Sequence, residues 1–220
     1  MININGQDVA TRVRRTFGDE AAVQVSDEDI VRWINDAQIE LVKRNETVLQ
    51  TTGTANIVAG TAAYSLPADL LILRSVRYKY DDMTSFVSLK YANLQEFDDT
   101  LNGWDGTLFT NANPKIFTRY ADTISLFPTP DQSATGGLKY LYSTIPTDIT
   151  DLTDALSLPL IYHTTIVNYC LWQASLLDED YDPSQLHKAY LDESVNNLIA
   201  LDSMEQTEYY PKITVLEDDM

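Results

Sequence analysis

The spacing of apolar residues changes twice along this chain, and that change limits the possible folds more than any other feature. Near both ends, apolar residues recur every three to four positions, which is typical of amphipathic helices. Between about residues 48 and 150, Val, Thr, Tyr and Ile alternate with polar residues and turn residues recur at short intervals, as in strands. The order predicts an α+β protein with a β-rich segment inserted between two helical halves.

Four segments show the helical period, and we expect them to pack as one bundle. Residues 26–45 are the clearest, because Ser26 is a good N-cap, acidic residues fill the first turn and basic residues the last. Residues 158–177 are apolar nearly all round, which predicts a central, buried helix. The other helices are predicted at 6–17 and 183–203. The residues of the last helix expected to face inward are Leu186, Tyr190, Val195, Leu198 and Leu201.

The middle of the chain contains about seven short predicted strands, consistent with a small antiparallel β-sandwich or barrel. The predicted strands span residues 54–58, 62–66, 71–80, 86–90, 115–120, 123–127 and 138–144. Gly60 lies in the short connection between the first two, which predicts a hairpin. A short helix is also predicted at 93–101.

The expected domains are a helical bundle (1–47 and 151–205), an inserted β-rich domain (48–150) and an extended C-terminal arm (206–220). The arm contains a proline and lacks a helical period. It is either a loose end or a docking peptide, and its apolar content favours docking, since an alternating segment can add to the edge of a neighbouring sheet. The expected protein-interaction residues are Tyr209, Tyr210, Pro211, Ile213, Val215 and Leu216.

Composition excludes several classes of protein. The 220 residues include 15 Lys+Arg and 33 Asp+Glu, giving a formal net charge of −18, and 44% are hydrophobic, enough to form a core. The apolar runs are far shorter than the ~20 residues of a membrane helix, and the N-terminus lacks the pattern of a signal peptide. The acidity opposes tight binding of nucleic-acid phosphates, although DNA can slide past a surface of like charge.

The sequence contains no pattern typical of an enzyme. A single cysteine, Cys170, excludes an internal disulfide and a cysteine-based zinc site, and we expect it and His163 to be core or interface residues. No phosphate-binding glycine loop or nucleophile elbow is present. The acidic run from Asp178 to Asp182 can hold a hard cation but lacks the calcium-loop spacing, which favours a simple connection. We therefore expect no catalytic residue, no metal and no cofactor.

One strand carries basic residues at alternating positions, namely Arg77 and Lys79, with Arg74 before them. Two interpretations remain open. The strand can present a face to nucleic acid, where basic and aromatic residues act together, or it can be an ordinary half-exposed strand that is salt-linked to acidic neighbours. The sequence favours the second interpretation.

Five stretches occur in an order and spacing that resemble phage head–tail adaptor (connector) proteins, particularly the tail tubular protein A type of short-tailed phages. These stretches are Ile34–Leu41, Val58–Asp69, Asn113–Phe117, Ile124–Pro130 and Leu158-Pro159. Individually these stretches mark strands, turns and helix starts. The resemblance that they carry extends over most of residues 26–200.

The resemblance implies a structural virion protein that forms a ring, usually of twelve copies, between the portal and the tail. The helical bundle would contact the portal, the β-rich domain would face the tail nozzle or neighbouring subunits, and the arm would dock on the portal or an adjacent copy. Double-stranded DNA would pass through the lumen without specific binding. Assembly would take place in the host cytoplasm, with no membrane involved. Two alternatives are another neck or tail ring, such as a tail terminator, and a hydrolase that uses a carboxylate pair of the β-rich domain.

Overall fold

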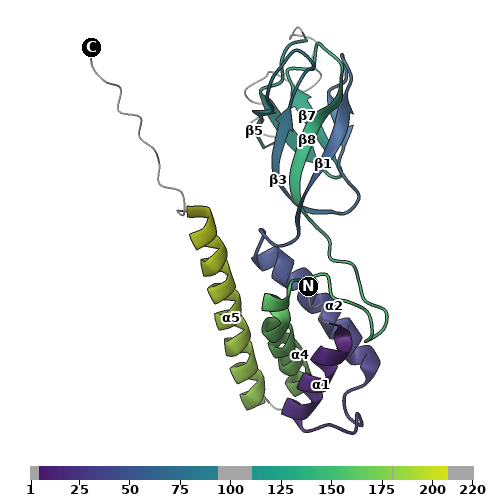
Figure 1. Ribbon diagram of the computed structural model, residues 1–220, viewed down its shortest axis with the longest axis vertical. Coiled ribbons are helices and arrows are strands. Elements are labelled where there is room, and N and C mark those ends of the chain that lie inside the picture. The colour runs from purple at the N-terminus through teal and green to yellow at the C-terminus, as the bar shows by residue number, and fades with distance from the viewer. Residues whose placement is uncertain (1–4, 94–110, 180, 208–220) are drawn as a thin grey trace, which may run out of the picture. The chain divides into compact units, whose positions relative to one another are not determined.

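The computed structural model describes residues 5–93, 111–179 and 181–207, and of 202–207 only the backbone. The chain forms two compact units, shown in Figure 1. The helical unit contains the residues before Val48 and after Ile145, and the β unit contains Val48–Ile145. The described residues form four α-helices and two four-stranded sheets, so the predicted α+β class is confirmed.

The first two helices begin and end where their capping residues predict. Helix α1 (Gly6–Phe17) begins at a capping box, in which the Asp8 backbone N–H donates to Asn5 Oδ1 at 3.1 Å. It ends at Gly18, whose φ of 86° is costly for any residue with a side chain. Helix α2 (Asp27–Arg44) begins where Ser26 accepts a hydrogen bond from the Asp29 backbone N–H.

Helix α4 (His163–Leu177) is the centre of the helical unit. It follows a 3-10 turn, η1 (Leu160–Tyr162), and packs against α1, α2 and α5. Cys170 and Ala174 are completely buried in these contacts. The prediction of a central helix is confirmed, and the cysteine is a core residue. However, the α-helix begins at His163 and not at residue 158, and Leu160, Ile161 and Leu177 are exposed.

Helix α5 (Tyr181–Thr207) lies alongside α4 (Figure 1) and buries a different face from the one expected. Val195 and Leu198 are buried as expected, together with Leu191. However, Leu186, Tyr190 and Leu201 are 50%, 49% and 58% exposed, so the prediction was wrong for them. The physical reason is the helical period of 100° per residue, which places Leu191, Val195 and Leu198 together on the face toward α4 and turns the other three to an adjacent, more exposed face.

The β unit is a sandwich of two sheets. One sheet has the strand order β1 (Gln50–Ile57), β8 (Ala134–Thr144), β3 (Leu70–Tyr78) and β4 (Val87–Ser88). The other has the order β2 (Ala63–Ser65), β7 (Thr123–Phe127), β6 (Ile116–Tyr120) and β5 (Lys90–Tyr91). Buried side chains from both sheets form a single core, in which Tyr80, Tyr140, Ile124, Leu126 and Leu138 are almost fully enclosed.

Two expectations about the sheets are wrong. First, β1 and β2 do not form a hairpin, because the connection through Gly60 carries the chain from one sheet to the other. Second, the sandwich is not entirely antiparallel, since β5 and β6 pair in parallel. The long connection between these two strands permits that direction. The helix predicted at 93–101 lies, from residue 94 onward, outside the described residues.

Candidate interaction surfaces

The six interaction residues predicted from the sequence all lie outside the described residues. Tyr209, Tyr210, Pro211, Ile213, Val215 and Leu216 follow α5 in the chain. The surfaces on which they or other partners would dock belong to the described part of the two units.

The segment from Pro146 to Leu158 lies against α2 and is held there by polar side chains. Asn35 makes a reciprocal pair with the Ile149 backbone, donating from Nδ2 to its carbonyl at 3.0 Å and accepting from its N–H at 2.9 Å. Fully buried Gln38 accepts from the Ser157 N–H at 2.8 Å. These contacts replace the pairing that a strand would give to the backbone of this segment.

A surface cavity of about 610 Å³ lies beside this segment. Its lining includes four carboxylates and one guanidinium, namely Asp27, Glu28, Asp36, Asp151 and Arg32. Hydrogen bonds from the Thr153 backbone and hydroxyl lower the pKa of Asp151, which stays ionised in ordinary conditions. The cavity therefore presents negative charge and suits a cationic or N–H-rich surface of a partner.

The loop that joins α1 to α2 is rigidly held, and it exposes an apolar residue. Buried Asp19 accepts from the backbone N–H groups of Val23, Gln24 and Val25 at 2.8–2.9 Å, and these bonds lower its pKa. Val23 is nevertheless 82% exposed. A small pocket of about 220 Å³ lies nearby, lined in part by Phe17, Val25 and Leu177.

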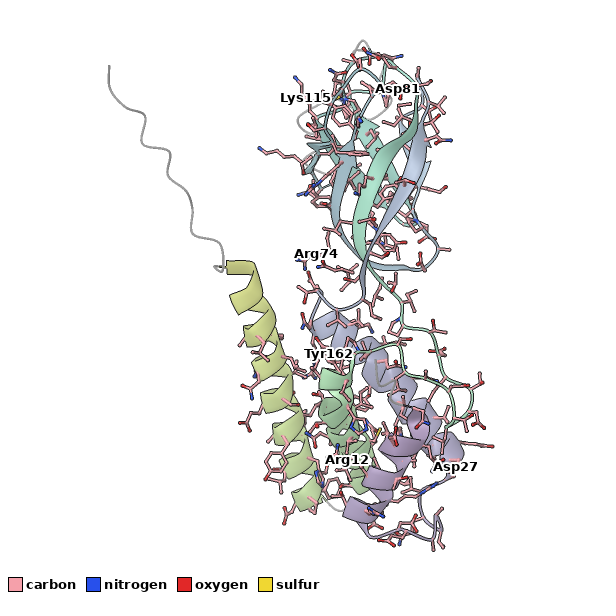
Figure 2. All side chains as sticks on the ribbon, viewed as in Figure 1. Arg12, Asp27, Arg74, Asp81, Lys115 and Tyr162 are labelled. Atoms are coloured by element: carbon pink, nitrogen blue, oxygen red, sulfur yellow. The ribbon has the colours of Figure 1, made fainter. Side chains whose placement is uncertain are left out.

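A histidine and an arginine join α1 to α4 in the helical unit. Arg12, labelled in Figure 2, places its guanidinium 3.0 Å from His163 Nδ1. Because a guanidinium can only donate, this contact requires an unprotonated Nδ1. Burial, and then the charge of Arg12, lower the pKa of His163, while Asp8 raises it. The imidazole is therefore neutral at pH 7 and acts as a structural acceptor.

Basic residues gather on the outer face of the β1-β8-β3-β4 sheet. Arg77 and Lys79 alternate with the buried residues Tyr78 and Tyr80, so they point away from the core. Lys139 lies directly opposite Arg77 on the next strand, and its Nζ is 5.7 Å from the centre of the Phe86 ring. Figure 2 shows Arg74, which belongs to β3, and Asp81, which follows that strand, toward opposite ends of the β unit.

None of these three cations is salt-linked within the described residues. No carboxylate there lies within 4.0 Å of the cationic groups of Arg77, Lys79 or Lys139. For Arg77 and Lys79, the described residues therefore supply no acidic partner of the kind that the salt-linked interpretation expects. We call Arg77, Lys79, Lys139 and Phe86 the basic face.

The described residues offer no evident catalytic group. Cys170 is fully buried, and burial raises the pKa of its thiol, which makes it a poor nucleophile. Across the described ranges, no three His, Cys, Asp or Glu side chains are grouped so that they could hold a metal ion. Likewise, no helix in the part of the chain that is described has the length and apolar character to cross a membrane.

Comparison with known proteins identifies the family. The model of the SU10 adaptor protein family matches residues 4–215, which is nearly the whole chain. The chain belongs to the SU10 adaptor protein family. A search of curated proteins found no match.

Family membership makes this chain a phage structural adaptor protein, and so a partner of other phage structural proteins. The resemblance to phage adaptors seen in the sequence is confirmed at this level. An adaptor family also points to a structural, non-enzymatic role and to a location in the virion.

Sequence reasoning missed two surfaces of this adaptor. The sequence prediction puts residues of two apolar stripes of α5 on one inward face, because periodicity does not tell which stripe packs. For the basic face, the sequence indicates only the part on β3 and not the residues that neighbouring strands add to it. The sequence signal for the rest of the basic face is Lys139, a single lysine between Leu138 and Tyr140 in the last strand. Since both of its neighbours are buried, the alternation of a strand places Lys139 on the outer side of the sheet.

Proposed function

We propose that this adaptor forms a ring between the portal and the tail, through which the genome passes. The observation that carries the proposal is the family match over residues 4–215. The five sequence stretches support the more specific likeness to the tail tubular protein A type, and with it a ring of twelve copies. Such a ring needs head-to-tail contacts, in which two different surfaces of each subunit meet.

The charge distribution supports genome passage without tight binding. The helical unit has 24 acidic and 8 basic residues, and the β unit has nine acidic and seven basic. A lumen lined by the more acidic unit would repel phosphates and let double-stranded DNA slide. In this proposal the helical unit contacts the portal, and the β unit faces the tail nozzle or tube protein.

The arm supplies the second contact of each subunit. We propose that Tyr209, Tyr210, Pro211, Ile213, Val215 and Leu216 dock on the portal or on an adjacent copy. A terminal segment that alternates apolar and polar residues and follows directly after α5 is suited to that role.

The mass of the purified chain, with and without portal rings, tests the proposal. Native mass spectrometry or light scattering should detect a closed ring, either of the chain alone or on the portal. A chain that stays monomeric and ignores the portal would contradict the adaptor role.

Two alternatives predict other outcomes. A tail terminator would form a ring but bind tail tubes instead of portals, so adding each assembly in turn separates the two. A hydrolase would lose activity when Asp or Glu residues in the turns of the β unit are replaced and would tolerate removal of the arm. An adaptor should show the reverse pattern.

A further inference from the structure

The basic face contains like charges in direct opposition. Arg77 and Lys139 are cross-strand neighbours, and Lys79 lies two residues beyond Arg77 on the same side of the sheet. Like charges placed opposite each other in a sheet destabilise the pairing. Within the described residues no carboxylate offsets this repulsion. The arrangement therefore suits a surface that is covered by an anionic partner.

The strands hold these cations at fixed positions. Gly137 on β8 lets the chain at Lys79 approach closely, because a Cβ at Gly137 would lie 2.8 Å from the Lys79 carbonyl oxygen. The Lys79 N–H donates to the Gly137 carbonyl at 2.7 Å. Phe86 gives the same surface an aromatic ring beside Lys139. The face thus combines fixed positive charge with an apolar contact.

The C-terminal segment of the chain has the complementary chemistry. Residues 208–220 contain four acidic residues and one lysine, and three of the acids are consecutive, Glu217, Asp218 and Asp219. Two adjacent tyrosines, Tyr209 and Tyr210, follow Glu208 in this segment and match the aromatic part of the basic face.

We propose that the basic face of one copy binds the acidic C-terminal segment, residues 208–220, of another copy. The inference rests on the proposed ring, to which it adds the surface that receives the arm. The partner is a second copy because head-to-tail closure needs two complementary surfaces on one chain, and this chain carries both. Duplex DNA is disfavoured as the occupant, since the chain has a net charge of −18.

A synthetic peptide of residues 208–220, added to the chain ending at Thr207, tests the contact directly. That chain keeps all of α5. We expect binding that weakens at higher salt and is weakened about tenfold by Arg77→Glu together with Lys139→Glu. The matched control is Lys90→Glu with Lys115→Glu, neighbouring lysines of the other sheet whose replacement changes the net charge equally. Equal weakening by both pairs, or no binding by the parent chain, would overturn the inference.

A mixing experiment shows whether the segment acts between copies. One chain lacks residues 208–220, and the other is full-length with Arg77→Glu and Lys139→Glu. Each should remain monomeric alone, while the mixture should give 1:1 dimers that cannot close into a ring. Formation of dimers supports the inference, and a mixture that stays monomeric contradicts it.

Two further outcomes identify a different occupant. Peptide binding that appears only after Glu96, Asp98, Asp99 and Asp105 are neutralised would assign the face to residues 94–110 of the same chain. Binding of a duplex DNA fragment that the peptide cannot displace would assign it to nucleic acid. Failure of peptide binding with rings still forming on the portal overturns this inference and leaves the adaptor role intact, whereas loss of rings in every condition overturns the adaptor role.

Discussion

At the scale of single residues, polar side chains replace regular secondary structure where the chain needs to be fixed. Asn35 pairs with both backbone groups of Ile149, much as a neighbouring strand would. Asp154 accepts from the backbone N–H groups of Thr150 and Asp151 at 2.8 and 2.9 Å, which orders the following turn. The Asn35 pair fastens the segment that follows the β unit to α2, and the Asp154 bonds fix the shape of that segment.

Replacing Asn35 with Ala should lower the free energy of unfolding of the helical unit by about 1–3 kcal/mol, because it leaves the N–H and carbonyl of buried Ile149 without partners. Urea unfolding followed by circular dichroism at 222 nm measures the change. The control is Asn197→Ala on the exposed side of α5, which should stay within about 0.5 kcal/mol of the parent. Equal stability of the two variants would show that the Asn35 pair is energetically unimportant.

The two histidines give the helical unit a pH dependence. Burial lowers the pKa of His187, and burial with Arg12 lowers that of His163, below the ordinary 6.5. The unfolded chain therefore binds protons at a pH where the folded chain does not, so stability is present above pH 6.5 and falls as the pH drops toward the folded values. We expect a lower urea midpoint at pH 5.5 than at pH 7.5.

The variant His163→Gln should show a smaller loss between these two pH values, since it keeps an acceptor for Arg12 but cannot titrate. The change in urea midpoint with pH needs to be compared between the two proteins, because acidification also reduces the net charge of −18 and so eases repulsion within either chain. If the urea midpoint falls equally for the parent and the variant between pH 7.5 and pH 5.5, His163 makes no contribution to the pH dependence.

At the scale of elements, α5 has two apolar stripes with different roles. Leu191, Val195 and Leu198 pack toward α4, and Arg44 pairs with Asp192 to join α5 to α2. Leu186, Tyr190 and Leu201 lie on an adjacent face and remain about half exposed. An exposed stripe of this kind is consistent with contact between subunits.

Leu191→Ala should cost about 2–5 kcal/mol of stability because it opens a cavity in the bundle, whereas Tyr190→Ser should change stability by less than about 0.5 kcal/mol. If the stripe is part of the proposed ring, Tyr190→Ser should instead reduce the ring fraction on portal complexes, as measured by native mass spectrometry. Unchanged rings with Tyr190→Ser, Leu186→Ser and Leu201→Ser would assign the stripe to solvent.

Elements whose ends carry local signals were predictable from the sequence, and their partners were not. Ser26 and Gly18 mark helix ends through hydrogen bonds and backbone conformation that belong to a few neighbouring residues. By contrast, the connection at Gly60 looks the same whether the next strand pairs with the last or crosses to the other sheet. The face that α5 buries and the opposition of Lys139 to Arg77 likewise depend on contacts between residues distant in sequence.

At the scale of the whole molecule, long-range repulsion and local attraction between copies compete. Each copy carries a net charge of −18, most of it in the helical unit. The repulsion acts over tens of ångströms, while a contact between a carboxylate and the basic face acts over about 4 Å. The Debye length falls from ~30 Å at 0.01 M salt to ~8 Å at 0.15 M, so moderate salt removes the repulsion first.

Association of the purified chain should therefore pass through a maximum as salt increases. Light scattering should detect monomers near 0.01 M salt, the largest mass near 0.15 M, and smaller species again near 1 M, where the Debye length of ~3 Å screens the local contacts as well. The variant with Arg77→Glu and Lys139→Glu should lack the maximum, while the control with Lys90→Glu and Lys115→Glu should keep it. If association is strongest at the lowest salt, attraction between oppositely charged surfaces of neighbouring copies outweighs the repulsion between their net charges even at long range, which would contradict this prediction.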